Sequence, residues 1–208
     1  AIFYLGQGLL FGIFIYIISY GIEILINISH GQFKSLEFYV STYSVEGNIG
    51  KQTAIIFFII CILGNIINVI MEEGIFRGLF QKLFEQKYNF LLSAILSSLL
   101  FGFWHVIAPL RSYYDGTISF EEMFINIIIL VVTSTLVGFK FSMMTKLTGN
   151  LYMSMGDHFV NNTIINILHI VSKDGSIDKL LVMRISIAQT LSFLIVLIYF
   201  KLSKNECS

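Results

Sequence analysis

The chain has 208 residues, of which 56% are hydrophobic and 12% charged, and its mean hydropathy is +0.81. These values lie outside the range of soluble globular domains and indicate an integral membrane protein. Thirteen basic and thirteen acidic residues cancel, so no basic field would attract nucleic acid, and we expect no nucleic-acid partner.

Six apolar segments are each long enough to cross about 30 Å of hydrocarbon, which takes about 20 helical residues. The short alternating pattern of a transmembrane barrel is absent. The sequence therefore predicts an all-α fold, a polytopic bundle of about six transmembrane helices that forms a single domain over residues 1–208. In chain order the predicted spans cover residues 3–27, 52–76, 90–108, 123–142, 148–171 and 180–200.

Two features bear on the ends of these spans. Pro109, the only proline, has no N–H to continue a helix and predicts that the third span ends at Ala108. The longest polar connection, residues 29–51, can lie on the membrane surface. The first and last spans show no feature beyond those of generic membrane helices.

The second span carries three ionisable residues in the stretch "NVIMEEGIFRGLF", residues 68–80. A charge at the middle of a membrane helix costs about 2.5 to 3.5 kcal/mol even on insertion scales, so such residues usually face the bundle interior and carry function. On a helical wheel Glu72 continues a polar stripe, whereas Glu73 precedes Arg77 by one turn and can pair with it. The wheel thus separates Glu72, a candidate general base, from a Glu73–Arg77 pair. The alternative is that all three form one structural ion cluster.

The third and fifth spans also carry polar residues. Phe101 and His105 share a face of the third span, and a single histidine near a span's end is often only a hydrogen-bonded packing residue. In the fifth span His158 and Asn162 are four residues apart, so both can donate to one developing oxyanion. The alternative is a seam of interhelical hydrogen bonds. Five polar residues of this span fall within about 140° of the wheel and should face inward: Ser154, Asp157, His158, Asn161 and Asn162.

Depth in the membrane is compatible with one shared site. Counted at about 1.5 Å per residue from one membrane surface, Glu72 and His158 lie roughly 14 Å deep, Asn162 roughly 20 Å and His105 roughly 24 Å. Helix tilt can absorb much of this spread. Three neighbouring spans can therefore bring a carboxylate, two imidazoles and a carboxamide to one buried place.

The three segments together resemble the motifs of the CAAX protease and bacteriocin-processing family of intramembrane proteases, also called the Abi family. Its EExxxR motif corresponds to Glu72, Glu73 and Arg77. Its FxxxH motif corresponds to Phe101 and His105, and its HxxxN motif is the pair in the fifth span. The resemblance covers roughly residues 65–165 and implies an intramembrane endopeptidase.

In this resemblance Glu72 and His105 activate water, His158 and Asn162 hold the oxyanion, and Glu73, Arg77 and Phe101 support the site. We expect no cofactor. The alternative is zinc, for which Glu72, His105 and His158 are acceptable ligands that leave a position for water.

The expected partners are the bilayer and a membrane-associated or hydrophobic peptide, either a prenylated CAAX-type protein or the precursor of a bacteriocin or signalling peptide. The many Ile, Phe, Asn and Lys residues indicate an AT-rich bacterial genome and hence a bacterial cytoplasmic membrane. The rival functions are a proton-coupled transporter and a non-catalytic bacteriocin immunity protein. The internal repeats and midplane helix breaks typical of transporters are not evident.

Overall fold

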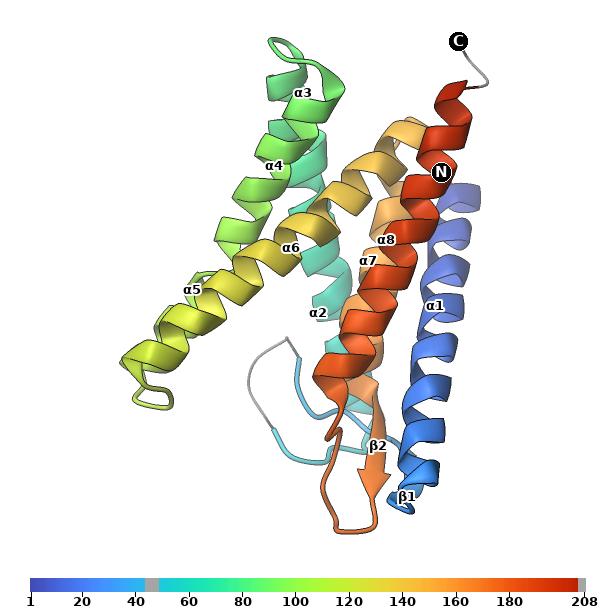
Figure 1. The fold of residues 1–208 in the computed structure, drawn as a ribbon, viewed down its shortest axis with the longest axis vertical. Helices are drawn as coiled ribbons and strands as arrows, with labels where there is room; N and C mark the ends of the chain where they lie inside the picture. Colours follow the sequence, from blue (N-terminus) through green and yellow to red (C-terminus); the bar gives the residue numbers. More distant parts are fainter. Residues whose placement is uncertain (44–48, 206–208) are drawn as a thin grey trace. The chain divides into compact units, whose positions relative to one another are not determined.

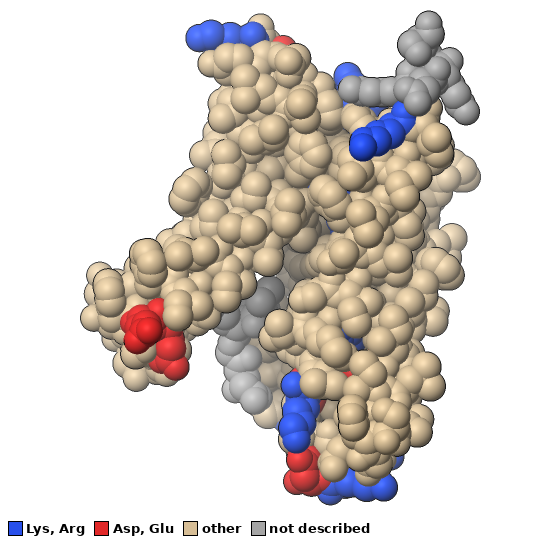
Figure 2. Space-filling model, viewed as in Figure 1, with Lys and Arg blue, Asp and Glu red and all other residues tan. Residues whose placement is uncertain are grey.

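The computed structural model describes residues 1–43 and 49–205. Over these residues five helical segments are long and apolar enough to cross a membrane, namely Ile2–Ser29, Ile55–Glu85, Phe90–Tyr114, Phe120–Thr148 and Leu181–Ser203. Figure 2 shows charged side chains mostly near the ends of helices, with wide uncharged surfaces between them. Large apolar side chains such as Ile59, Leu63 and Ile67 are exposed on these surfaces, as expected of helices that face lipid. The chain is an integral membrane protein, as the sequence predicts.

The chain folds into two compact units (Figure 1). Unit 1 consists of Ala1–Ile70 and Met155–Leu194, and unit 2 of Met71–Ser154 and Ile195–Ser208.

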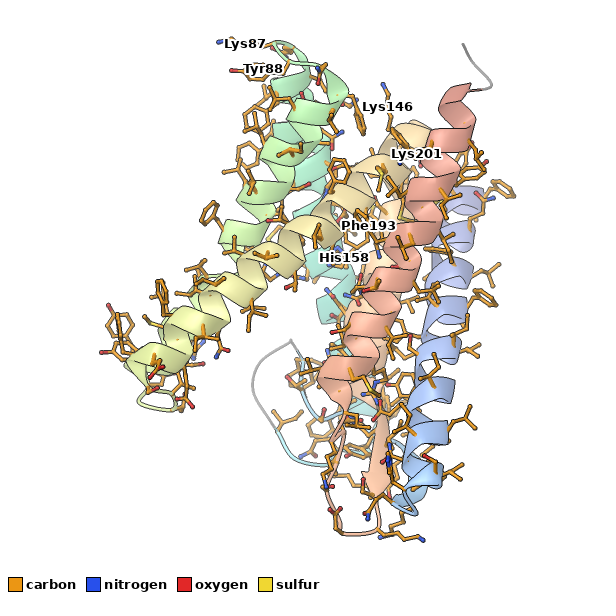
Figure 3. All side chains as sticks on the ribbon, in the orientation of Figure 1. Lys87, Tyr88, Lys146, His158, Phe193 and Lys201 are labelled. Atoms are coloured by element: carbon orange, nitrogen blue, oxygen red, sulfur yellow. The ribbon has the colours of Figure 1, made fainter. Side chains whose placement is uncertain are left out.

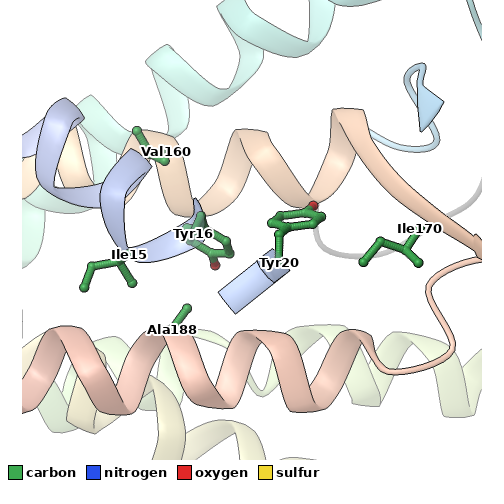
Figure 4. Close-up of a cluster of buried hydrophobic side chains, with 6 residues drawn as sticks. All are labelled: Ile15, Tyr16, Tyr20, Val160, Ile170 and Ala188. Atoms are coloured by element: carbon green, nitrogen blue, oxygen red, sulfur yellow. The ribbon is translucent and has the colours of Figure 1, made fainter. Parts of the chain in front are cut away.

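Unit 1 contains α1 (Ile2–Ser29), β1 (Phe33–Phe38), most of α2 (Ile55–Glu73), most of α7 (Tyr152–Ile167), β2 (Leu168–Ser172) and the first part of α8 (Leu181–Asn205). Helices α1, α7 and α8 enclose a buried core, shown in Figure 4, that consists of Ile15, Tyr16, Tyr20, Val160, Ile170 and Ala188.

Glycines bring α1 and α7 into close contact within unit 1. A Cβ atom on Gly156 would lie 2.6 Å from the carbonyl oxygen of Leu5, and a Cβ atom on Gly12 would lie 2.9 Å from Cβ of Val160. Small residues of this kind let membrane helices approach backbone to backbone. The contact fixes α7, the helix that carries the HxxxN motif, against the first span.

Residues 148–171 do not form the single long helix predicted. Helix α7 has 16 residues, fewer than the roughly 20 that a full crossing requires, and the chain continues as β2. Strand β2 pairs antiparallel with β1, with Leu36 opposite Ile170, so part of the polar connection after α1 is a strand. The apolar run "LHIVS" is ambiguous between helix and strand by periodicity, and long-range pairing decides in favour of the strand.

A buried ionic network, which was not predicted from the sequence, joins the first and last spans of unit 1. Arg184 donates to Glu23 and to Asp178, both at 2.9 Å, and Asp178 also accepts from the Ile170 amide at 3.0 Å. Nδ1 of His169 lies 2.6 Å from the second carboxylate oxygen of Asp178. The signal was present, because Glu23 and Arg184 are ionisable residues inside apolar segments.

Unit 2 begins at Met71 and contains the π-helix η1 (Gly74–Phe80), α3 (Gln81–Glu85), α4 (Phe90–Trp104), α5 (Ile107–Tyr114) and α6 (Phe120–Thr148). Helix α6 starts with a capping box between Ser119 and Glu122 and ends at Gly149, whose φ of 69° suits glycine. Helices α4 and α6 pack closely, since a Cβ atom on Gly102 would lie 2.6 Å from the carbonyl oxygen of Val131.

Basic side chains mark one end of unit 2. In Figure 3 Lys87 and Tyr88 lie in the connection between α3 and α4, and Lys146 lies near the end of α6. The ammonium groups of Lys87 and Lys146 each lie 5.5 Å from an aromatic ring centroid, that of Tyr88 and that of Phe90 respectively. Lysines next to aromatic rings are typical of the membrane interface.

The third predicted span is broken earlier than Pro109. Helix α4 ends at Trp104, His105 is its C-terminal cap residue, and Pro109 lies in the first turn of α5. A proline is tolerated there because the first N–H groups of a helix have no intrahelical partner. The prediction that the helix runs to Ala108 is therefore wrong, and the break places His105 at the junction of two helices.

Candidate active site

The predicted pair of Glu73 and Arg77 is confirmed in unit 2. Nη1 of Arg77 donates to Oε1 of Glu73 at 3.1 Å, and neither side chain has exposed surface. Arg77 lies in the π-helix η1, which begins directly after Glu73. π-Helical turns are rare in proteins, and those that occur are often found at functional sites.

Aromatic rings surround the Arg77 guanidinium. Its Cζ atom lies 4.3 Å from the ring centroid of Phe101 and 5.2 Å from that of Phe141, distances at which a cation is attracted to the ring face. Gly138 of α6 provides the space, since a Cβ atom there would lie 2.7 Å from Nη2 of Arg77 and 3.1 Å from Phe101. The EExxxR and FxxxH motifs therefore meet at Arg77 and Phe101.

His105 is fixed by the residue one turn before it. Its ring packs edge-on against the Phe101 ring, with centroids 4.8 Å apart, and its Nδ1 lies 2.8 Å from the Phe101 carbonyl oxygen. Because a carbonyl oxygen only accepts, Nδ1 carries the proton in this hydrogen bond. In the neutral ring Nε2 then has the lone pair, the form that a general base or a metal ligand requires.

Glu72 faces inward, as the helical wheel predicts. The side chain is 5% exposed, and Asn65, which lies on the same face of α2, is also buried. Ile66, Ile67 and Ile70 of the same helix are exposed. Glu72 thus belongs to the buried stripe of α2, on the apolar helix that also carries Glu73.

The HxxxN motif lies in unit 1, and its inward orientation is also confirmed. His158 is 4% and Asn162 9% exposed, and Asp157 and Ser154 are buried as well. Figure 3 shows His158 on α7. One helical turn separates the ring of His158 from the carboxamide of Asn162, so both polar groups lie on one face of α7.

One buried cation near the first two motifs was not singled out from the sequence. Lys140 of α6 is 1% exposed, and its Nζ lies 4.8 Å from the ring centroid of Phe141, which also contacts Arg77. A lysine inside the apolar segment 123–142 was a usable signal, because charged residues in membrane spans generally serve the bundle interior.

Unit 2 therefore brings together Glu73, Arg77, Phe101 and His105 and carries Glu72, while His158 and Asn162 belong to unit 1. The meeting of all four proposed catalytic groups stays a prediction. Over its described residues, neither unit by itself groups three His, Cys, Asp or Glu side chains closely enough to hold a metal ion. The zinc alternative takes ligands from both units and likewise stays a prediction.

The family model described as type II CAAX prenyl endopeptidase Rce1-like matches residues 53–164, which is more than half of the chain and contains all three motifs. No curated protein and no solved structure matches the chain.

Proposed function

Because the chain belongs to the Rce1-like family of type II CAAX prenyl endopeptidases, we propose that it is an intramembrane endopeptidase that hydrolyses a peptide bond in a membrane-associated substrate. The observation that carries the proposal is the buried cluster in unit 2, where Arg77 contacts both Glu73 and Phe101 and the Phe101 carbonyl sets the proton on His105. Desolvated ionic groups inside a membrane protein are costly and are retained mainly for function.

In the proposed reaction Glu72 and His105 activate a water molecule. The water oxygen attacks the carbonyl carbon of the scissile bond while Glu72 takes a proton from the water. Nε2 of His105 accepts a hydrogen bond from the water and orients it. The attack forms a tetrahedral intermediate with a negatively charged oxygen. When the C–N bond breaks, the proton held by Glu72 passes to the leaving amine, which restores the carboxylate.

The oxyanion requires donors that are in place before it forms. We assign this role to His158 and Asn162, whose ring N–H and carboxamide NH₂ lie one turn apart on α7. Loss of one such donor typically lowers kcat by about 10² to 10³. Glu73, Arg77 and Phe101 support the site, since they hold the helix of Glu72 and the ring of His105.

The substrate in this proposal is a lipid-anchored or hydrophobic peptide that reaches the site from the bilayer. Two sources are distinguishable, a prenylated CAAX-type protein and the precursor of a bacteriocin or signalling peptide. The composition favours a bacterial cytoplasmic membrane and therefore the second source. Cleavage of a farnesylated peptide and of its unmodified counterpart, in the same proteoliposomes, separates the two.

The test of the function is Glu72→Gln, which keeps the shape of the side chain and removes the base. We expect cleavage to fall by about 10² or more, since general-base catalysis typically contributes about 10² to 10⁴. Glu121→Gln, an exposed change in the first turn of α6, is the matched control and should keep full activity. Normal cleavage by Glu72→Gln contradicts the assigned role. A wild-type protein that cleaves none of the peptides but moves protons across the vesicle membrane favours a transporter.

A further inference from the structure

A chain of hydrogen bonds leads from the first and last spans to Asn162. The Tyr16 hydroxyl of α1 and Nε2 of Gln189 in α8 both donate to Oδ1 of Asn161. Nδ2 of Asn161 in turn donates to Oδ1 of Asn162 at 3.2 Å. All four side chains belong to unit 1, and Figure 4 shows Tyr16 in the core formed by α1, α7 and α8.

These bonds define which way each carboxamide points. A carboxamide oxygen has two lone pairs and its nitrogen has two N–H donors. Oδ1 of Asn161 receives two donors, which use both lone pairs, so the Nδ2 group of Asn161 is the one directed at Asn162. Because Asn162 accepts through Oδ1, its own Nδ2 group is directed away from Asn161.

The orientation of Asn162 matters for an oxyanion site. A carboxamide that rotates by half a turn presents its oxygen where its NH₂ group had been, and an oxygen repels an oxyanion. Catalytic groups must be held to within about 10–20° by their neighbours to be effective. Tyr16 is 2% exposed, so its hydroxyl bond is sheltered from competition by solvent.

We propose that Tyr16 and Gln189 are positioning residues that act through Asn161 to keep Nδ2 of Asn162 as the donor to the oxyanion. The inference rests on the proposed function. It gives a role to the first and last spans, because residues 16 and 189 lie outside the range that matches the family model.

The fold offers a matched control on the same helix. Tyr20 lies one turn after Tyr16 on α1, is also buried, and its hydroxyl donates to the Leu168 carbonyl oxygen rather than to Asn161. Tyr16→Phe and Tyr20→Phe therefore each remove one buried hydroxyl, and the Tyr20 hydroxyl bonds only backbone carbonyl oxygens, those of Leu168 and, at 3.4 Å, Ile164. Only the first removes a bond to the Asn161 network.

Steady-state cleavage by the two variants in proteoliposomes tests the proposal. We expect Tyr16→Phe to lower kcat by about 10-fold with KM unchanged, since the oxyanion forms only in the transition state. Tyr20→Phe should stay within about twofold of the wild type, and the two variants should have similar melting temperatures. Gln189→Leu removes the other donor to Asn161 and should resemble Tyr16→Phe, so the test does not depend on one variant.

A double variant separates positioning from a general structural effect. In the background of Asn162→Ala, Tyr16→Phe should cause no further loss, because the group that it positions is absent. Equal losses in Tyr16→Phe and Tyr20→Phe, or independent losses in the double variant, overturn the inference and leave the peptidase intact. If Asn162→Ala itself cleaves normally, the oxyanion assignment in the proposed function fails, and the positioning role fails with it.

Discussion

Arg77 donates to Glu73 across 3.1 Å, and both side chains are completely buried in unit 2. The rings of Phe101 and Phe141 lie 4.3 and 5.2 Å from the guanidinium carbon. The pair is therefore a fully desolvated ionic contact of the candidate active site.

We expect Glu73→Gln to destabilise the protein strongly. The substitution removes the carboxylate that is hydrogen-bonded to the buried Arg77, and breaking a buried pair in this way costs about 3 to 5 kcal/mol. The melting temperature in detergent should fall markedly. The control is Lys82→Met in the exposed pair with Glu85, where the loss should be about 1 kcal/mol or less. A similar fall in melting temperature in both variants would show that the buried Glu73–Arg77 pair stabilises the protein no more than an exposed pair does.

Gly138→Ala should disturb the same cluster from the opposite side. The new methyl group would lie 2.7 Å from Nη2 of Arg77 and 3.1 Å from Phe101, so the guanidinium has to move. Overpacking of this kind typically costs about 1 to 3 kcal/mol. Gly64 is exposed on α2, and a Cβ atom added there would contact no neighbouring side chain or strand within 4 Å. Gly64→Ala should therefore be neutral or slightly stabilising. Thermal unfolding of the two variants measures the difference, and a stable Gly138→Ala with full activity contradicts the tight packing.

The contacts that the sequence predicted correctly are local. The Glu73–Arg77 pair and the shared helix face of Phe101 and His105 each involve residues four positions apart, where helical geometry alone sets the neighbours. The inward orientation of Glu72, His158 and Asn162 followed from the cost of placing polar groups in lipid.

The features that it missed depend on distant parts of the chain or on small local differences. The pairing of β1 with β2 and the contact of Glu23 with Arg184 join residues more than 100 positions apart. A single sequence without periodic signals does not specify such partners. The π-helix differs from an α-helix by about one residue per turn, and helix α4 ends four residues before Ala108; the apolar pattern of the sequence does not resolve such local differences.

Asp178 should make the stability of unit 1 sensitive to acid. Burial raises the pKa of this carboxyl, but the hydrogen bond from His169, the charge of Arg184 and the Ile170 amide lower it more, so the pKa in the folded protein is below its ordinary range. Because this pKa is lower in the folded protein than in the unfolded chain, where it is about 3.9, the ionised carboxylate stabilises the fold fully at a pH above about 3.9. This stabilisation is lost as the pH falls through the pKa of the folded protein.

The free energy of unfolding should therefore decrease below about pH 4, and Asp178→Asn should lack this part of the decrease. Denaturant unfolding at pH 7, 4 and 3 measures it. Asp115→Asn, in the exposed pair with Arg111, is the control and should follow the wild type. The same pH profile for the wild type and Asp178→Asn would mean that Asp178 does not stabilise the fold through its charge.

The proposed reaction uses no metal, and this is a direct prediction. Incubation with 1,10-phenanthroline should leave the cleavage rate unchanged, and the purified active protein should contain much less than one equivalent of zinc. The hydrogen bond at Nδ1 of His105 leaves Nε2 with the lone pair that a base and a metal ligand both require. The two mechanisms are therefore distinguished by the chelation experiment and not by the geometry of His105. Inhibition that added zinc reverses would keep the peptidase and assign Glu72, His105 and His158 as the ligands.

The central claim is that Glu72, His105, His158 and Asn162 surround one site. The most direct measurement is an experimental structure of the full chain carrying Glu72→Gln, in lipid and with a bound substrate peptide. We predict that residue 72 and His105 lie on one side of a water-sized space next to the scissile carbonyl, with His158 and Asn162 opposite and within hydrogen-bond distance of its oxygen. A structure in which the two pairs point into separate helix contacts, with the peptide elsewhere, would contradict the account.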